Sequence, residues 1–444
     1  MALSTEQLDY LERLEKATLE DQTIQRELMS RKAMYVYLYR KAAETGTFVP
    51  PLDRQYVITY LLNRWYTYGP LQSAMDDPFT SDVTVIGNYD TIVRSKGENY
   101  SAEEMKFIDE DELQDFISRL FEGSNYSYSL SRPITDAITK DGFRVNVIGG
   151  PSTRNTIKDE EGRITTEQAT ILTIRKPLYP FTMDDLVSLK TLNTDMREYL
   201  RLVMVLGDSF LIGGGVGSSK TTVMNATTRD MPLGMKNAMV EELPEASPLA
   251  PWFMRLTNRD PNAQGQGAIS MEDNIRNTLR MDTENVYIQE LRRASEAFLF
   301  TQLYLMVKRQ TASTIHAKIG FKDAIESIII RFLYLATAGD DSKNATLENT
   351  AMFMSGKLRH FIAMRDMLVG GERLKRMTEI GEVVDYDHLT KELLIHKPFI
   401  YNYRTHDWDC FGISKDMAER LELEGIEYHL PVTAQEPMHF RVNA

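Results

Sequence analysis

The sequence contains one cysteine, Cys410, among its 444 residues. A single thiol excludes an internal disulfide framework and suits a reducing compartment. Positive charge is also scarce, since 51 Lys and Arg face 64 Asp and Glu, for a formal net charge of −13. A broad nucleic-acid interface needs a basic surface, so no direct nucleic-acid binding is expected.

Long apolar runs are missing as well. The most apolar run, residues 297–307, is about half of the ~20 residues that a bilayer-spanning helix needs. Charge begins at Glu6, so the N-terminus lacks the apolar region of a signal peptide. We therefore expect a soluble, cytoplasmic protein. Such a protein can still act on a membrane from its cytoplasmic side.

The composition, 42% hydrophobic and 26% charged, is that of a globular chain long enough for two or three domains. Residues 4–45 have a helical pattern that starts at a possible capping box, Ser4 with Gln7. A further helix is predicted over 53–65, after Pro50 and Pro51. This N-terminal helical segment, 1–66, is either a simple bundle or a partner-docking module.

Residues 67–176 have a mixed pattern that predicts an α/β domain. Apolar and polar residues alternate in several short runs, as in half-buried strands, and one longer run is amphipathic like a helix. The predicted strands are 82–86, 90–94, 143–148 and 170–175, and the predicted helix is 110–121. Two prolines then fall within residues 176–182, which favours extended backbone, so 177–184 is predicted to be a hinge.

The chain is organised around residues 209–226, SFLIGGGVGSSKTTVMNA. An apolar strand, a glycine cluster and a Lys-Thr-Thr helix start are the order of a phosphate-binding P-loop. In the spacing G-x-x-x-x-G-K-[ST], the second glycine is replaced by Ser219. Lys220 is expected to reach the outer phosphates and Thr221 to hold Mg²⁺. The residues expected to bind ATP are Gly214, Gly215, Val216, Gly217, Ser218, Ser219, Lys220, Thr221 and Thr222.

Strands and helices alternate on both sides of this segment. Predicted strands at 237–240, 285–289 and 313–315 imply a parallel sheet with helices on both faces. Residues 185–444 are accordingly predicted to form a RecA-like P-loop domain with a C-terminal helical part. The fold class is therefore α/β.

Acidic groups at strand ends supply the other parts of an NTPase. Glu290 closes a predicted strand. It either polarises the attacking water or helps to hold magnesium, or it is a solvated loop glutamate. Glu241, Glu242 and Glu245 close another strand, where like charges repel unless a cation or an arginine lies between them. They indicate a magnesium and water site, with Glu242 as the metal ligand, or a charged turn at Pro244.

Three further residues are candidates for catalysis. His316 ends a short strand, where it senses the γ-phosphate, couples the site to a moving loop, or has a structural role. Phosphoryl transfer gains much from an arginine finger, often supplied across an interface. Arg144 and Arg175 lie on predicted strands just before the hinge and are candidates for that role, although strand arginines are commonly surface residues.

Together these segments resemble the type II/type IV secretion-system ATPases, and among them the CpaF/TadA-like branch of tight-adherence (Flp) pili. The resemblance runs from about residue 68 almost to the C-terminus, in order. Tyr68-Gly-Pro-Leu and Ser81-Asp-Val-Thr-Val-Ile-Gly resemble the opening of the family's N-terminal domain. Segments 141–146 and 173–176 resemble its two arginine strands, 240–245 its Asp box, 289–297 its Walker B, 313–317 its His box and 377–383 a late strand.

The resemblance implies a homo-hexameric ring with ATP and Mg²⁺ bound between two domains at subunit interfaces. It implies γ-phosphate contacts for Arg144 and Arg175, the catalytic carboxylate for Glu290, and the His-box role for His316. It also implies a motor at the cytoplasmic face of the inner membrane that acts on a platform protein of a pilus or secretion machine.

Some residues depart from the family pattern. Glu242 replaces an aspartate, Gln289 replaces a glycine, and residues 306–309 lack a usual glycine-histidine pair. A serine forced into left-handed backbone at 219 costs ~1–2 kcal/mol. These departures indicate a slow or specialised ATPase. A conjugative or type IV secretion ATPase and a nucleotide-binding structural ring with weak hydrolysis are the alternatives.

Overall fold

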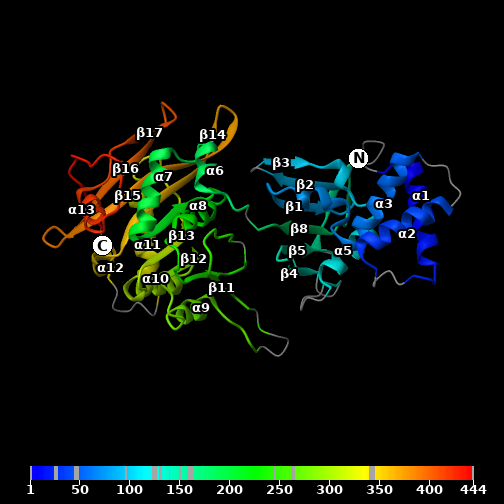
Figure 1. The fold of residues 1–444 in the computed structure, drawn as a ribbon, viewed down its shortest axis with the longest axis horizontal. Helices are drawn as coiled ribbons and strands as arrows, with labels where there is room; N and C mark the ends of the chain where they lie inside the picture. The colour runs from blue at the N-terminus through cyan, green and yellow to red at the C-terminus, as the bar shows by residue number, and fades with distance from the viewer. Residues whose placement is uncertain are drawn as a thin grey trace. The chain divides into compact units, whose positions relative to one another are not determined.

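The computed structural model describes residues 3–24, 29–44, 50–95, 98–122, 128–129, 133–139, 141–149, 152–158, 164–177, 179–244, 246–259, 261, 266–339 and 346–442. The chain divides into two compact units, Met1–Pro177 and Leu178–Ala444. Figure 1 shows both units, and each is described here by itself. Among the described residues, no helix combines the length and apolar character needed to cross a membrane.

The first unit begins with three helices that share one apolar core (Figure 1). The predicted capping box is confirmed, because Gln7 N–H donates to Ser4 Oγ and the Gln7 side chain accepts from Ser4 N–H. The prediction of one helical segment over residues 4–45 was wrong. The first helix ends at Leu19, and a turn follows in which Asp21 accepts the Thr23 N–H. The helices are α1 (Thr5–Leu19), α2 (Arg31–Glu44) and α3 (Pro51–Tyr66).

The rest of the first unit is an antiparallel sheet with strand order β3-β2-β1-β8-β5-β4. The predicted strands and the amphipathic helix are confirmed. One face of the sheet packs its buried valines and isoleucines against the helix α5. The strands are β1 (Thr80–Ile86), β2 (Asp90–Ser95), β3 (Glu98–Ser101), β4 (Ile134–Ile138), β5 (Arg144–Ile148) and β8 (Ile171–Arg175). The short pieces are η2 (Gly69–Leu71), α4 (Gln72–Asp76), η3 (Glu103–Met105), α5 (Glu110–Leu120) and a separate hairpin of β6 (Asn155–Lys158) and β7 (Ile164–Glu167).

The second unit is built on one large sheet with strand order β11-β10-β12-β13-β9-β14-β15-β16-β17, and β18 pairs with β16. Neighbouring strands are parallel from β11 to β14 and antiparallel beyond it. The strands are β9 (Ser209–Gly214), β10 (Asn237–Glu241), β11 (Phe253–Thr257), β12 (Asn285–Leu291), β13 (Gln310–His316), β14 (Leu358–Val369), β15 (Glu372–Asp387), β16 (Glu392–Asn402), β17 (Asp407–Cys410) and β18 (Met438–Arg441).

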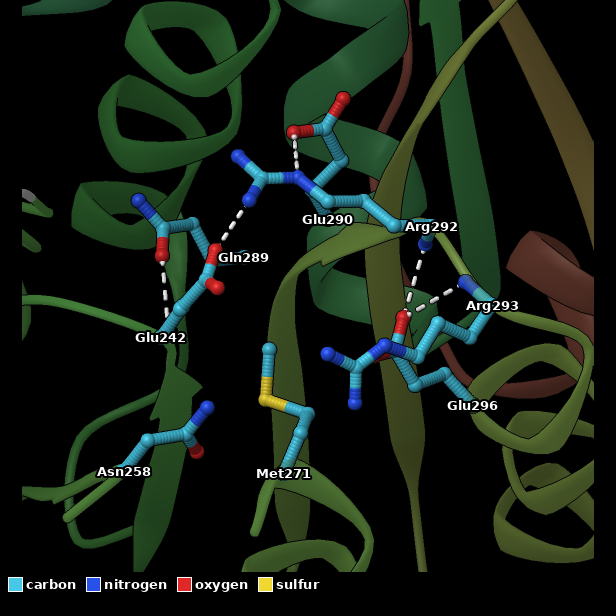
Figure 2. Close-up of a pocket in the computed structure, with 8 residues that line it drawn as sticks. All are labelled: Glu242, Asn258, Met271, Gln289, Glu290, Arg292, Arg293 and Glu296. Atoms are coloured by element: carbon cyan, nitrogen blue, oxygen red, sulfur yellow. Dashed lines mark hydrogen bonds and ion pairs between the residues drawn. The ribbon is translucent and has the colours of Figure 1, made fainter. Parts of the chain in front are cut away.

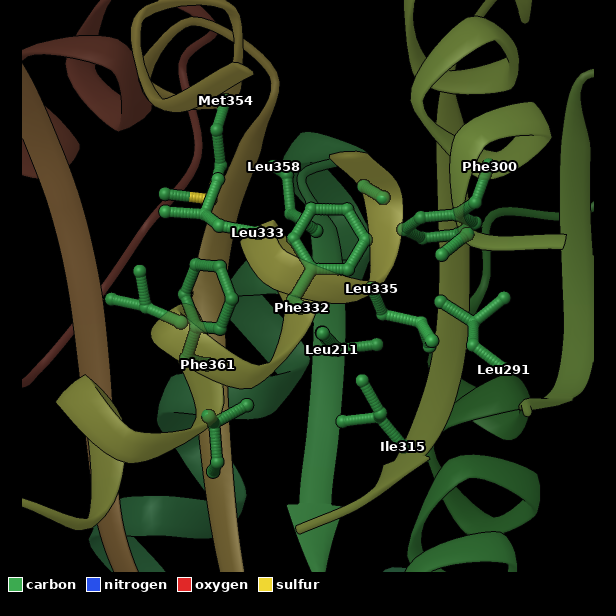
Figure 3. Packing of buried hydrophobic residues seen from close by; sticks show 14 of the residues in the cluster. Leu211, Leu291, Phe300, Ile315, Phe332, Leu333, Leu335, Met354, Leu358 and Phe361 are labelled. Carbon is green, nitrogen blue, oxygen red and sulfur yellow. The ribbon is translucent and has the colours of Figure 1, made fainter. Parts of the chain in front are cut away.

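Helices cover both faces of this sheet, as predicted for a RecA-like α/β fold. Along β9, Phe210 and Ile212 enter one apolar cluster and Leu211 enters the other, because strand side chains alternate between faces. Figure 3 shows the second cluster, where Leu211 and Ile315 of the sheet face Phe332 of α11. The helices are α6 (Met183–Ser188), α7 (Thr194–Leu206), α8 (Lys220–Thr227), η5 (Thr228–Asp230), α9 (Met271–Thr278), α10 (Ala294–Met306), α11 (Ala324–Thr337), α12 (Leu347–Ser355) and α13 (Lys415–Leu423).

The expected helical C-terminal part is largely strand. Beyond α12 the chain forms the long antiparallel strands β14 to β17, and α13 follows them. The turn between β14 and β15 is Gly370-Gly371, both with positive φ (61° and 92°). Paired glycines favour a tight hairpin, a signal that helical periodicity alone does not reveal.

Candidate functional site

The P-loop connects the buried strand β9 to the start of helix α8. All of β9 is buried, and α8 begins at Lys220. Between them the backbone turns through left-handed conformations at Gly217 (φ 69°) and Ser219 (φ 69°). Thr221 and Thr222 follow in the first turn of α8, whose N-terminal N–H groups favour an anion.

Two contacts shape the loop from inside. Ser218 Oγ donates to the Gly215 carbonyl oxygen at 2.9 Å. The buried Lys220 Nζ donates to the carbonyl oxygens of Gly214 at 3.2 Å and Gly215 at 2.9 Å. A Cβ on Gly214 would lie 2.2 Å from the Met364 carbonyl oxygen, so glycine is required there.

Ser219→Gly is expected to stabilise the protein by a few tenths to about 1 kcal/mol. Glycine adopts the observed φ without the Cβ penalty, although it loses more backbone entropy on folding. Urea unfolding measures the change, and the same protein tests whether relief of this strain raises ATP turnover.

Lys190→Gly is the matched control, because Lys190 also has a positive φ (54°) and lies outside the P-loop. We expect similar stabilisation without a change in turnover. An unfolding free energy of Ser219→Gly below that of the wild type would contradict the strain argument.

Sheet order places the strand-end residues beside the P-loop. The strands β10, β12, β13 and β9 are consecutive neighbours and parallel, so their carboxyl ends lie at one edge. His316 is the register partner of Gly214, and Ala317 N–H donates to the Gly214 carbonyl oxygen at 3.2 Å. Glu290 lies near the end of β12, and Glu242 directly follows β10.

Electrostatics link Glu290 with the P-loop lysine. Burial lowers the pKa of Lys220, the negative charge of Glu290 opposes that shift, and the positive charge of Arg292 adds to it. Both charges are therefore close enough to Lys220 to be felt there. The arrangement gives a positive centre for phosphate with a carboxylate beside it.

A pocket opens next to these residues (Figure 2). Arg292 crosses it: Nε donates to Glu290 Oε2 at 2.9 Å, and Nη1 contacts Glu242 Oε2. Gln289 Oε1 accepts the Glu242 N–H at 3.2 Å, which ties the ends of β10 and β12 together. The role of Arg292 was missed from the sequence, where the pair Arg292-Arg293 after a strand was its only signal.

The buried Glu296 supports the start of α10 below the pocket. Its Oε2 accepts the N–H groups of Arg292 at 2.8 Å and Arg293 at 3.0 Å. Burial raises the pKa of Glu296, and these two backbone donors act against the shift. The Glu296 carboxylate thus holds the backbone of the turn that carries Arg292 in place.

Glu241 lies apart from the other predicted acids. Its side chain is 0% exposed, and Arg255 pairs with both oxygens, from Nε at 2.7 Å and Nη2 at 3.0 Å. Ala246 N–H donates to Oε2 at 2.8 Å. The structure therefore pairs the buried Glu241 of β10 with the partly exposed Arg255 of β11, whereas Glu242 faces the pocket. Glu245 lies outside the described residues.

Arg255→Ala is expected to destabilise the protein by about 2–3 kcal/mol. Removing one partner of a buried pair leaves an uncompensated charge, and partial exposure of Arg255 reduces the usual cost. Arg255→Lys is expected to restore part of the loss in urea unfolding. An unfolding free energy equal to that of the wild type would contradict a structural role for the pair.

Arg144 and Arg175 belong to the first unit, where they are direct cross-strand partners on β5 and β8. Asp82 of β1 is the partner of Arg175 on its other side, and Arg175 Nε donates to Asp82 Oδ1 at 2.8 Å. The structure thus brings the two arginines together on one row of the sheet.

The P-loop residues fit a magnesium nucleotide. Among the described residues, no group of three His, Cys, Asp or Glu side chains forms a metal cage. Mg²⁺ in nucleotide sites is held by one or two carboxylates, a hydroxyl and substrate phosphates, so such a cage is not required. Thr221 at the start of α8 and the carboxylates of Glu242 and Glu290 are the matching donor types.

No family model matches the chain. An uncharacterized protein of Methanocaldococcus jannaschii, MJ0900, is 25% identical over 327 residues, which are 73% of this chain and 56% of that protein. The chain thus spans about half the length of this relative. The type IV secretion system protein PtlH of Bordetella pertussis is 31% identical over 121 residues, 27% of this chain and 35% of PtlH. A putative conjugal transfer protein of Mycobacterium tuberculosis, Rv3659c, is 30% identical over 95 residues, 21% of this chain and 27% of that protein.

Solved structures show similarity at lower identity. The Legionella pneumophila ATPase DotB is 15% identical with a TM-score of 0.48, over 76% of this chain and 80% of DotB. The pilus retraction motor PilT with bound ADP is 14% identical with a TM-score of 0.48, over 72% of this chain and 83% of PilT. The tight-adherence branch stays a prediction.

Proposed function

We propose that the chain is a Mg²⁺-dependent ATPase whose second unit binds and hydrolyses ATP. One observation carries the proposal: parallel sheet order gathers the P-loop, Glu290, His316 and Glu242 at one edge. These residues are far apart in the sequence. Ligands of open α/β sheets bind outside the carboxyl ends of the strands, which is this edge.

The residues have distinct roles in this proposal. Loop N–H groups and Lys220 bind the phosphates, and Lys220 exchanges its contacts with the Gly214 and Gly215 carbonyl oxygens for phosphate oxygens. Thr221 and Glu242 hold magnesium, which when bound neutralises charge on the transferred phosphoryl group. Glu290 orients the attacking water. His316, in register with Gly214, contacts the γ-phosphate.

The wider biological role is proposed from the resemblance of the sequence motifs to the type II/type IV secretion-system ATPases. We infer a homo-hexameric motor at the cytoplasmic face of the membrane, where ATP-driven motion about residues 177–184 acts on a platform protein of a pilus or secretion machine. Short stretches similar to a type IV secretion protein and to a conjugal transfer protein support this class. They equally support a conjugative or type IV secretion ATPase.

Phosphate release from Mg-ATP by the purified protein tests the enzymatic proposal, and binding of a fluorescent ATP analogue is measured in parallel. Turnover that requires Mg²⁺ supports it. Binding without turnover in an intact ring favours a structural nucleotide-binding ring, and the absence of binding overturns both. Light scattering with nucleotide tests the hexamer, which a stable monomer would contradict.

A further inference from the structure

Arg292 is the cation that lies between two carboxylates of the candidate site. Glu242 follows β10 and Glu290 lies on β12, and these strands are neighbours, so the two negative charges face one pocket. Figure 2 shows the Arg292 guanidinium between them, with Nε 2.9 Å from Glu290 Oε2 and Nη1 in contact with Glu242 Oε2. Like charges that face one pocket repel, and the guanidinium between them relieves the repulsion.

The bridge joins groups that are open to solvent. The side chains of Arg292, Glu242 and Glu290 are 56%, 44% and 23% exposed. Ion pairs at such positions are weak and screened by salt. The long arginine side chain has solvent to move into, whereas its backbone is fixed by Glu296. The contact is therefore one that a competing cation can replace.

Magnesium is such a competitor. It prefers carboxylate and phosphate oxygens, and these two carboxylates lie at the sheet edge that also carries the P-loop. A guanidinium and a divalent cation repel each other, so they cannot both bind closely to the carboxylates of Glu242 and Glu290. Arriving phosphates also bring new anionic partners to the sheet edge where Arg292 lies.

We propose that Arg292 is a positioning residue that occupies the Glu242–Glu290 pair in place of magnesium, and that its guanidinium leaves the pair when the Mg-nucleotide binds. This inference rests on the proposed ATPase function. Arg292 then holds both carboxylates in place in the empty site and sets the Mg²⁺ concentration at which the site becomes active.

Mg²⁺ titrations of Arg292→Ala test the inference with two readouts. One is ATP turnover at fixed, saturating ATP, and the other is binding of a slowly hydrolysed fluorescent ATP analogue. Removing the competing cation is expected to lower the half-saturating Mg²⁺ concentration about two- to fivefold in both readouts, the range of an exposed ion pair.

Arg292→Lys and Arg280→Ala are the matched variants. Lysine keeps the charge but is a point charge that does not span two carboxylates, so an intermediate shift is expected. Arg280 is exposed beyond α9, so Arg280→Ala makes the same change of net charge away from the pocket and should leave the Mg²⁺ dependence unchanged.

The outcomes separate this inference from the proposed function. If the wild type binds and hydrolyses ATP but Arg292→Ala leaves the Mg²⁺ dependence unchanged, the competition is wrong and the ATPase stands. A collapse of turnover at saturating Mg²⁺ without a shift would show that Arg292 stays on Glu290 during catalysis, which overturns the displacement. If Arg280→Ala shifts the half-saturating Mg²⁺ concentration as much as Arg292→Ala does, net charge alone explains the shift and the competition is wrong. A wild type that does not bind ATP overturns both.

Discussion

Glu290→Gln is expected to reduce phosphate release from Mg-ATP at least about a hundredfold while nucleotide affinity stays near that of the wild type. A positioned general base contributes about 10²–10⁴ to a rate, and a glutamine amide cannot accept the proton of the attacking water. The substitution keeps the size of the side chain, so the pocket around Arg292 should persist. Steady-state phosphate release and binding of the fluorescent ATP analogue measure the two effects separately.

Glu284→Gln provides the control at the other end of the same strand. Glu284 precedes β12, and its Oε2 accepts the Lys236 N–H at 2.6 Å, a bond that the glutamine carbonyl oxygen can also make. Turnover of Glu284→Gln should therefore match the wild type. Near-normal turnover in Glu290→Gln would remove Glu290 from the catalytic role, and loss of binding would show damage to the site instead.

The parts of the site that are local in the chain could be predicted from the sequence. The strand, glycine cluster and Lys-Thr start of α8 are contiguous, so residue pattern alone locates the P-loop. Glu290 and His316 could be located because each ends an apolar run, and parallel strands bring such ends to one edge. The left-handed backbone at Ser219 also followed from its place in the motif.

Side-chain partners across strands could not be predicted in the same way. Glu241 and Glu242 are adjacent, but Glu241 is the last residue of β10 and pairs with Arg255, whereas Glu242 lies just past the strand and faces the pocket. Arg255 pairs with Glu241 through the register of β10 and β11, which a single sequence does not specify. The ion pair between Arg292 and Glu242 likewise depends on the pairing of β10 with β12, which brings the ends of these strands together.

The double substitution Arg144→Gln/Arg175→Gln is expected to reduce turnover about a thousandfold, the lower range for removal of arginine fingers. Cross-strand register places Arg94, Asp82, Arg175 and Arg144 in one row on the face opposite the apolar core. Like charges directly opposite each other destabilise a sheet, and Asp82 offsets only part of this charge. An arginine pair maintained at that cost fits a role in binding an anion such as a phosphate.

Arg94→Gln is the matched control, because Arg94 lies in the same row as the direct partner of Asp82 and is outside the predicted pair. It should lose little turnover, and all variants should keep unfolding free energies within about 1 kcal/mol of the wild type, since exposed ion pairs contribute little. If Arg144→Gln/Arg175→Gln hydrolyses ATP at the rate of Arg94→Gln, the pair does not contact the transferred phosphate. A selective loss of turnover with folding intact would instead assign the first unit a direct part in hydrolysis, because the P-loop, Glu290 and Arg292 all belong to the second unit.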